Sequence, residues 1–466
     1  MIDQATTAVD YDVVVVGGGI AGLVAAWQLR DYRVLLLEAD NRVGGRIKSV
    51  QHNGYWANVG AQLFPHAETE IGRLAAEFGV EVRKVPGSVT AIGLGNRIVS
   101  PPRVELLPFV LKLSPLERLS FMWAGLKVAL GVRGANKVEA MPATTEADEH
   151  RRRVALAGFK SDQTFAEYVS SARGRARQVL ECIAHRSAAD ADDVSAGSAL
   201  LCCAHVMGPR DAVAATASVV VGGTEQVVLA LRDRLGGRIV TGAEVTEVAD
   251  RGDHVVVSYA HGGAARQVTA LTTVVATTTD VTRQIVADLP PELDKALDAV
   301  KNGAFLSMAI FTDEETPLPI DDIYAITTPG HEIDFLFNHA NVLRTGARKP
   351  GGSLMCYRGG RRAAELAKET DEVIRDTYLR SVYDLVPALR GHVVKTVVQR
   401  WPVGTIWGAP GPDRALAQPA LDRGFDHDRI VLAGDYFEPM SGMEPAAKSG
   451  VRAAQRVRRA LPQLVG

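Results

Sequence analysis

The chain has 466 residues, of which 47% are hydrophobic and 23% charged, and its formal net charge is −2. This length favours two domains that share a core, and so small a net charge gives no reason to expect a nucleic-acid partner. Four cysteines without metal-ligand spacing or a disulfide framework predict a reducing compartment and no metal site. The first ten residues lack a basic secretory start and no apolar run is long enough to span a membrane, so we expect a cytoplasmic protein.

The first predicted unit is a βαβ motif over residues 11–38. An apolar run at 13–16 enters a turn with three glycines, a helical stretch follows, and a second apolar run ends at Glu38. Gly17 permits the tight turn, Gly19 lets a pyrophosphate approach the backbone, and Gly22 lets the helix pack against the strand. Glu38 suits a free ribose, and the helix N-terminus suits phosphates. The motif therefore predicts a site for an adenosine diphosphate.

The continuation of this motif distinguishes a flavin from a nicotinamide. The segment Val43-Gly44-Gly45-Arg46 resembles the GGR segment of two-dinucleotide-binding-domain flavoproteins: monoamine and polyamine oxidases, protoporphyrinogen oxidase and phytoene-type desaturases. The resemblance implies FAD, with Gly44, Gly45 and Arg46 along its diphosphate and ribityl chain. We expect non-covalent attachment, because no cysteine lies in the segments around Trp407 or Asp435.

A β-hairpin and a helix are predicted next. Alternating apolar and polar residues around Gly54 predict the hairpin, and residues 70–78 have helical spacing that stops at Gly79. The exit of the hairpin resembles the segment that passes beneath the isoalloxazine ring, with Asn58 where the family often has an acid. The resemblance places four residues there: Gly60, Ala61, Gln62 and Leu63.

Residues 101–216 are predicted to be mainly helical. In the resembled flavoproteins this position holds a helical part of the substrate domain, which in protoporphyrinogen oxidase also touches a membrane. The apolar bias of residues 106–132 suggests a lipophilic substrate channel and peripheral membrane contact.

Two later segments return the chain to the cofactor. Residues 222–245 resemble the element whose valine, here Val245, meets the adenine through its backbone. Near the C-terminus a strand ends at Gly434-Asp435 and a helix starts near Met443. The resemblance implies that Asp435 binds the ribityl and diphosphate region and that the backbone of Met443 donates to flavin O2, which stabilises the reduced ring.

The predicted fold class is α/β, a Rossmann-like two-dinucleotide-binding-domain flavoprotein with a parallel FAD-domain sheet and a mixed α+β substrate domain. The FAD-binding domain would comprise residues 1–100, 217–300 and 401–466. The substrate domain would comprise a helical part, 101–216, and a sheet part, 301–400, that covers the flavin.

The predicted chemistry is hydride transfer from the substrate to flavin N5. Amine oxidases of this group carry a lysine on a covering strand, where this sequence has Ser307, and an aromatic residue where it has Gly442. Ile406 or Trp407 falls where the other aromatic would lie. These departures favour C–C dehydrogenation of a lipophilic cyclic or isoprenoid molecule. An amine oxidase with an atypical aromatic cage is the alternative, and a flavoprotein whose FAD is not turned over oxidatively, such as an isomerase, stays open.

A C–C dehydrogenation also needs a group that accepts the proton lost from the neighbouring carbon. Candidates for this group on the expected covering strands are Tyr324, Asn338, His339 and Tyr357. The candidate catalytic residues are therefore His339 and Tyr324, together with Ser307 and Trp407 at the positions of the family's lysine and second aromatic residue. The sequence leaves open the electron acceptor, oxygen or another compound, and the oligomeric state.

Overall fold

The computed structural model describes residues 9–62, 68–207, 217–346, 348–425, 427 and 429–465. Its first sheet has seven strands in the order β10-β11-β12-β1-β2-β9, with β18 also paired to β12. Strands β1, β2, β9, β18 and the end of β12 run parallel, whereas β10, β11 and the start of β12 form an antiparallel meander. The bounds are β1 Tyr11–Val16, β2 Val34–Glu38, β9 Ile239–Thr241, β10 Ala243–Asp250, β11 Val255–His261, β12 Ala264–Val275 and β18 Ile430–Leu432.

Both faces of the first sheet are covered, which explains why β1 and β2 are continuous apolar runs. Val13 and Val15 face one side, and Val14 and Val16 face the other, because successive side chains alternate along a strand. The first side packs against α1 Ile20–Gln28, α2 Glu70–Phe78, α10 Glu225–Leu235 and α16 Met443–Val465. The second packs against α11 Thr279–Ile285, α12 Pro291–Asp298 and α15 Asp413–Arg423.

A second sheet, mostly antiparallel, has the order β17-β13-β16-β15-β14-β6-β7. Its outer face is covered by α13 Gly360–Leu366 and α14 Asp371–Leu385, and its inner face packs against the hairpin β3 Ser49–His52 and β4 Tyr55–Asn58. The strands are β6 Ser88–Leu94, β7 Arg97–Val99, β13 Lys301–Thr312, β14 Ile323–Thr327, β15 Phe335–Asn338, β16 Gly352–Gly359 and β17 Val393–Trp407.

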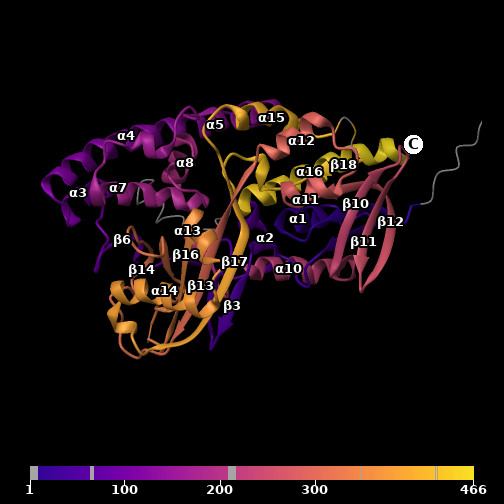
Figure 1. Cartoon of the computed structure of the whole chain (residues 1–466). Coiled ribbons are helices and arrows are strands. Elements are labelled where there is room, and N and C mark those ends of the chain that lie inside the picture. Colours follow the sequence, from indigo (N-terminus) through magenta and orange to yellow (C-terminus); the bar gives the residue numbers. More distant parts are fainter. Residues whose placement is uncertain are drawn as a thin grey trace, which may run out of the picture.

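The helical part forms one end of the molecule, away from the first sheet (Figure 1). Its buried residues form a separate apolar cluster around Phe121, Phe165 and Leu200. Its elements are α3 Leu107–Val110, α4 Pro115–Glu139, α5 Glu146–Gly158, α6 Phe165–Tyr168, α7 Gly174–Glu181, the 3-10 helix η2 Cys182–Ser187 and α8 Ala196–Met207. Within the described residues, no helix combines the length and apolar character needed to cross a membrane.

The predicted βαβ motif, hairpin and helix over 70–78 are confirmed, but two predicted domain boundaries differ from the strand pairing. Strand β6 pairs in parallel with β14, so residues 88–99 belong to the second sheet and not to the first FAD-domain segment. Strand β17 stays in the second sheet as far as Trp407, because it pairs with β13 past residue 401. A further two-stranded ladder, separate from the β3–β4 hairpin, joins β5 Val82–Lys84 to β8 Ser218–Val220.

Candidate active site

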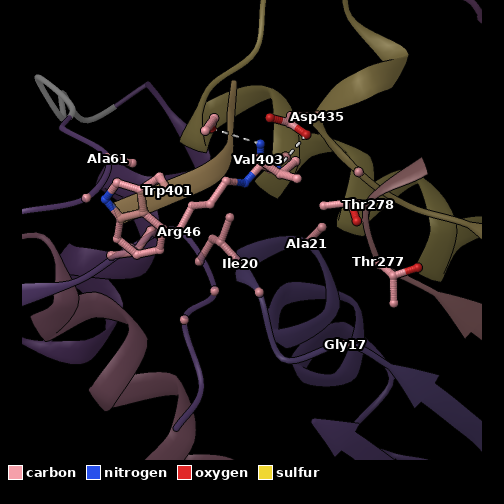
Figure 2. Close-up of a pocket in the computed structure, with 18 of the residues that line it drawn as sticks. Gly17, Ile20, Ala21, Arg46, Ala61, Thr277, Thr278, Trp401, Val403 and Asp435 are labelled. Atoms are coloured by element: carbon pink, nitrogen blue, oxygen red, sulfur yellow. Dashed lines mark hydrogen bonds and ion pairs between the residues drawn. The ribbon is translucent and has the colours of Figure 1, made fainter. Parts of the chain in front are cut away.

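One cavity of about 650 Å³ lies between the carboxyl ends of the parallel strands and the inner face of the second sheet (Figure 2). Residues far apart in sequence meet in its wall. The predicted cofactor residues that line it are Gly17, Gly19, Glu38, Gly44, Gly45, Arg46, Gly60, Ala61, Gln62, Val245, Gly434, Asp435 and Met443. Leu63 lies outside the described residues.

The glycine turn leads into a cradle formed by the backbone N–H groups at the start of α1, which have no partner within the helix. Gly17 has φ +100°, which favours glycine, and Gly19 caps α1 without a side-chain hydrogen bond. A Cβ on Gly19 would meet nothing within 4 Å, whereas a Cβ on Gly22 would lie 2.0 Å from the Gly17 carbonyl oxygen. Gly22 therefore stands behind the cradle and keeps α1 close to β1. The N-terminal N–H groups of α1 have no acid in their first turn and suit an anionic diphosphate.

Glu38 is the last residue of β2, and its side chain lies beside the glycine turn. Its Oε2 accepts from the N–H of Gly18 at 2.5 Å and its Oε1 accepts from the N–H of Asp40 at 2.8 Å. Burial raises the pKa of Glu38. Each carboxylate oxygen keeps a lone pair for a ribose hydroxyl, and Val245 lines the cavity alongside.

Arg46 and Asp435 join the N-terminal and C-terminal segments across this cavity. The Arg46 guanidinium lies 2.8 Å from the Asp435 carboxylate and also donates to the carbonyl of Gly404 at 3.2 Å (Figure 2). Ser441 donates its hydroxyl to the other oxygen of Asp435. The pair sets the loop that precedes α16 and directs the helix N-terminus, at Met443, into the cavity.

The segment after the hairpin is fixed by hydrogen bonds from three directions. The carbonyl of Val59 accepts from Ser307 Oγ at 2.6 Å and from Trp401 Nε1 at 2.7 Å. Thr224 Oγ1 donates to the carbonyl of Ala61 at 3.0 Å. Asn58, where the family often has an acid, accepts from the N–H of Thr224 at 3.0 Å and so secures this second contact. A rigid bed of small residues results, which suits a flat ring.

These residues fit FAD. Glu38 and Val245 would hold the adenosine, the glycine turn and Arg46 the diphosphate, and Gly60, Ala61 and Met443 the flavin ring. The small side chains and the unpaired N–H groups leave room and donors for this cofactor.

The wall of the cavity under the second sheet is aromatic. Phe305 and Tyr357 make an edge-to-face contact at 5.2 Å, and Tyr357 stacks on Phe335 at 5.1 Å. We call this end of the cavity the aromatic chamber; it is lined by Arg186, Phe305, Ser307, Phe337, Met355, Tyr357 and Trp401. The sequence prediction missed Arg186, Phe305 and Trp401 as site residues. The alternation of 305 with 307 and of 355 with 357 is the signal that could have placed two strands on the cavity.

The candidate catalytic residues are not all brought together. Ser307 lines the cavity, and Tyr324 lies behind the lining and donates to Gln62 Oε1 at 3.2 Å. Trp407 packs in the helical cluster outside the lining, and Trp401 is the aromatic residue of β17 that reaches the cavity. The irregularity of pairing between Gly303 and Phe305 sets which residues of β17 oppose the cavity strand.

His339 is not placed as a base. It is 1% exposed, lies outside the cavity lining, and its two ring nitrogens have no hydrogen-bond partner in the described part of the chain. Tyr324 and Phe337 flank its ring. Burial lowers the pKa of His339 to about 3, so the imidazole is neutral and enclosed. A catalytic base must reach the substrate, and His339 is not among the residues that line the cavity.

A buried polar group lies next to the aromatic chamber. His185 Nδ1 is 2.7 Å from Asp334 and its Nε2 is 3.3 Å from Asp190. Burial alone would lower the pKa of His185, but the two carboxylates raise it to about 12. Cys182, His185 and Asp334 are close enough to hold a metal ion, although a protonated imidazole is not a ligand. The expectation of no metal site stays a prediction.

The site and the fold define a flavin-dependent oxidoreductase. A family model described as flavin containing amine oxidoreductase matches residues 20–458, and the chain belongs to that family. The predicted family and fold class are thereby confirmed.

Known relatives are similar over different lengths. L-amino-acid oxidase of Mus musculus is 25% identical over 483 residues, 97% of this chain and 71% of the relative. Protoporphyrinogen oxidase 2 of Arabidopsis thaliana is 42% identical over 74 residues, which covers 16% of this chain and only 15% of the relative. A solved structure of putrescine oxidase has a TM-score of 0.75 at 17% identity and covers 96% of this chain and 99% of that one, so it is similar in fold.

Gly22→Ala tests the cradle. A Cβ at 2.0 Å from the Gly17 oxygen forces α1 away from β1, and we expect FAD affinity to fall by at least about tenfold, or about 1.4 kcal/mol. Flavin absorbance of the purified protein and titration of the stripped protein with FAD measure this. Gly237→Ala is the control, because a Cβ there meets nothing within 4 Å. An unchanged dissociation constant for Gly22→Ala would contradict the assignment.

His339→Leu tests whether the buried histidine is structural. The native state takes up its proton only near pH 3, whereas the unfolded chain does so near 6.5, so native stability falls as pH falls below 6.5. Between pH 7 and 5 the wild type should lose up to about 2 kcal/mol of unfolding free energy that the leucine variant keeps. Urea unfolding at both pH values measures the difference. A hundredfold loss of turnover with unchanged stability would instead restore His339 as a catalytic residue.

Proposed function

We propose that the protein is an FAD-dependent oxidoreductase that oxidises the carbon–nitrogen bond of an amine. The observation that carries the proposal is the aromatic chamber, which adjoins the bed of small residues at Gly60 and Ala61. Membership of the flavin containing amine oxidoreductase family supports it. The carbon–carbon dehydrogenation favoured by the sequence becomes the second candidate.

In the proposed reaction the carbon bonded to nitrogen loses a hydrogen with its two electrons, and the nitrogen loses a proton. The carbon–nitrogen single bond becomes an imine, which water hydrolyses to a carbonyl compound and ammonia or a smaller amine. FAD, when bound, supplies the two-electron acceptor, and oxygen or another compound regenerates it. If oxygen is the acceptor, it is reduced to hydrogen peroxide.

The chamber residues favour the reactive form of an amine. An ammonium has no free electron pair. Binding among the side chains of Phe305, Tyr357 and Trp401 removes water from the amine, and this loss of solvation disfavours the charged form, so a bound amine tends to lose its proton. Ser307 does not serve as a free base, because its hydroxyl donates to the Val59 carbonyl. The N-terminus of α16, at Met443, also lines the cavity. Its N–H groups and helix dipole would stabilise negative charge on the reduced flavin.

The sequence departs from the amine oxidase pattern at Ser307 and Gly442, but the aromatic chamber makes these departures less important. Gly442 lines the cavity without a ring, but Trp401, Phe305 and Tyr357 supply aromatic faces from three strands of the second sheet. A cage for an amine can therefore be built from other positions. Phe337 and Met355 extend the apolar wall, which supports the second candidate, a lipophilic cyclic or isoprenoid substrate.

We also propose non-covalent FAD and a cytoplasmic location. The four cysteines are free and buried, and none of them lines the cavity within the described chain. Free thiols suit a reducing compartment.

Anaerobic bleaching of the bound flavin tests the reaction. We expect rapid loss of the yellow absorbance with primary or secondary amines and amino acids, and no change with lipophilic cyclic ketones, porphyrinogens or polyenes. Dithionite serves as the control that the bound flavin can be reduced. Bleaching by the second panel alone would overturn the proposal in favour of carbon–carbon dehydrogenation.

A second proposal concerns a partner: α3 and α4 contact an anionic membrane surface. Large apolar side chains are exposed along one stripe of α4 at helical spacing, with Leu116 68% and Trp123 62% exposed. The stripe comprises Leu116, Leu119, Met122, Trp123, Leu126 and Leu130, and Leu106, Phe109 and Val110 around α3 continue it. Such a patch marks an interaction site.

Charge favours a lipid surface over a protein face. Arg103, Lys112, Arg133 and Lys137 are exposed along this segment, against one exposed acid, Glu105. Positive side chains next to exposed apolar ones are typical of helices that lie on anionic membranes. The segment projects at the end of the molecule opposite the first sheet (Figure 1), where a flat surface can reach it.

Flotation with vesicles tests this contact. We expect the protein to float with vesicles containing an anionic lipid, and the triple variant L116Q/W123Q/L126Q to remain at the bottom of the gradient. Leu416→Gln is the control, because Leu416 is 71% exposed but lies on α15. A wild type that stays with the soluble fraction would rule the contact out.

A further inference from the structure

We infer that Arg186 binds a carboxylate of the substrate, so that the substrate is an amino acid with an apolar or aromatic side chain. This inference rests on the proposed oxidation of an amine and names its substrate class. It starts from a charged residue that the proposed chemistry does not use.

Arg186 lines the aromatic chamber from η2 and brings a positive charge into it. Its guanidinium lies 5.1 Å from the ring centroid of Phe335, so it stacks on the aromatic wall. No acid of the described chain forms an ion pair with it. Arg186 is half-buried, so its guanidinium is exposed to the cavity and can bind an anion that enters it.

The cofactor does not supply that anion. The diphosphate position is formed by the glycine turn at the start of α1 and by Arg46, at the edge of the first sheet. Arg186 instead shares the chamber with Phe305, Phe337 and Tyr357, the residues of the second sheet. The anion that meets Arg186 therefore belongs to whatever occupies the chamber, the substrate.

The turn that carries Arg186 is held rigidly. The neighbouring His185 bonds to Asp334 and Asp190, and Asp334 also accepts from the N–H of Gly359 at 2.9 Å. Ala188 ends the turn with φ +56°. Because Asp334 is engaged by His185 and Gly359, it is not the partner of Arg186. A charge presented on a fixed turn binds an anion with less loss of freedom.

The guanidinium of Arg186 and a substrate carboxylate are chemically complementary. A planar guanidinium donates two parallel N–H bonds to a carboxylate, which fixes both its position and its orientation. With the carboxylate at Arg186 and an apolar side chain among the rings, the amine-bearing carbon is held at two points. A substrate without the carboxylate loses one of these points and leaves the arginine unpaired.

Matched substrate pairs test the inference. We expect phenylalanine to be oxidised with a kcat/KM at least about tenfold above that of phenethylamine, and leucine likewise above isopentylamine. Arg186→Gln should lower kcat/KM for the amino acids about a hundredfold, mainly through KM, and leave the plain amines within about threefold. Arg186→Lys should retain part of the preference, and its melting temperature and FAD content show whether the site folds.

Arg177→Gln is the matched control. Arg177 lies on α7 just before the same turn, is paired with Glu181, and does not line the aromatic chamber. We expect its kinetics to equal those of the wild type. An equal loss in both variants would assign the effect to the helical region as a whole and overturn the inference.

Binding without turnover separates the inference from the proposed function. Phenylacetate and phenylacetamide, titrated into the FAD-loaded protein, are followed by the change in flavin absorbance. We expect phenylacetate to bind at least about tenfold more tightly, and only when Arg186 is present. If no amine reduces the flavin but this preference holds, the amine reaction fails and the carboxylate site stands. If amines and amino acids are oxidised equally and Arg186→Gln changes neither, the carboxylate site is wrong and amine oxidation stands.

Discussion

The ion pair between Arg46 and Asp435 is the contact on which the cofactor site depends. It links two segments 389 residues apart and lies where Asp435 is almost completely buried. Removing either partner would leave the other charge without its counter-ion in a poorly solvated wall, which is costly. The pair also fixes the loop before α16, so the N-terminus of that helix faces the same cavity as the N-terminus of α1.

The substrate side is tied to the cofactor side by one backbone carbonyl. Val59 accepts from Ser307 on β13 and from Trp401 on β17, so two strands of the second sheet are anchored to the bed of small residues. Thr224, which directly precedes α10, anchors the same bed through the carbonyl of Ala61. Since these bonds are short and enclosed, the distance between chamber and bed is set by polar contacts and not by loop length.

The cofactor half of the site could be predicted because it depends on main-chain conformation. A positive φ at Gly17 or a Cβ clash at Gly22 restricts the residue type, and that restriction is visible in the sequence itself. The chamber could not be predicted in the same way. Trp401 and Trp407 lie six residues apart on β17, so the alternation of side chains along a strand does not distinguish them. Which of them reaches the cavity depends on where β17 crosses it and on the irregular pairing opposite Gly303 and Phe305, neither of which the sequence shows.

Arg186 shows why the remaining part needs the structure. Nothing in its neighbourhood in sequence distinguishes Arg186 from the other arginines. Its role is inferred from two structural facts: no acid of the described residues forms an ion pair with it, and the adjacent His185 is bonded to Asp334, 149 residues away. The two arginines of the cavity therefore differ in chemistry. Arg46 is neutralised by Asp435 and organises the protein, whereas Arg186 keeps its charge available, so that one cavity can hold the diphosphate at one end and a second anion at the other without competition between them.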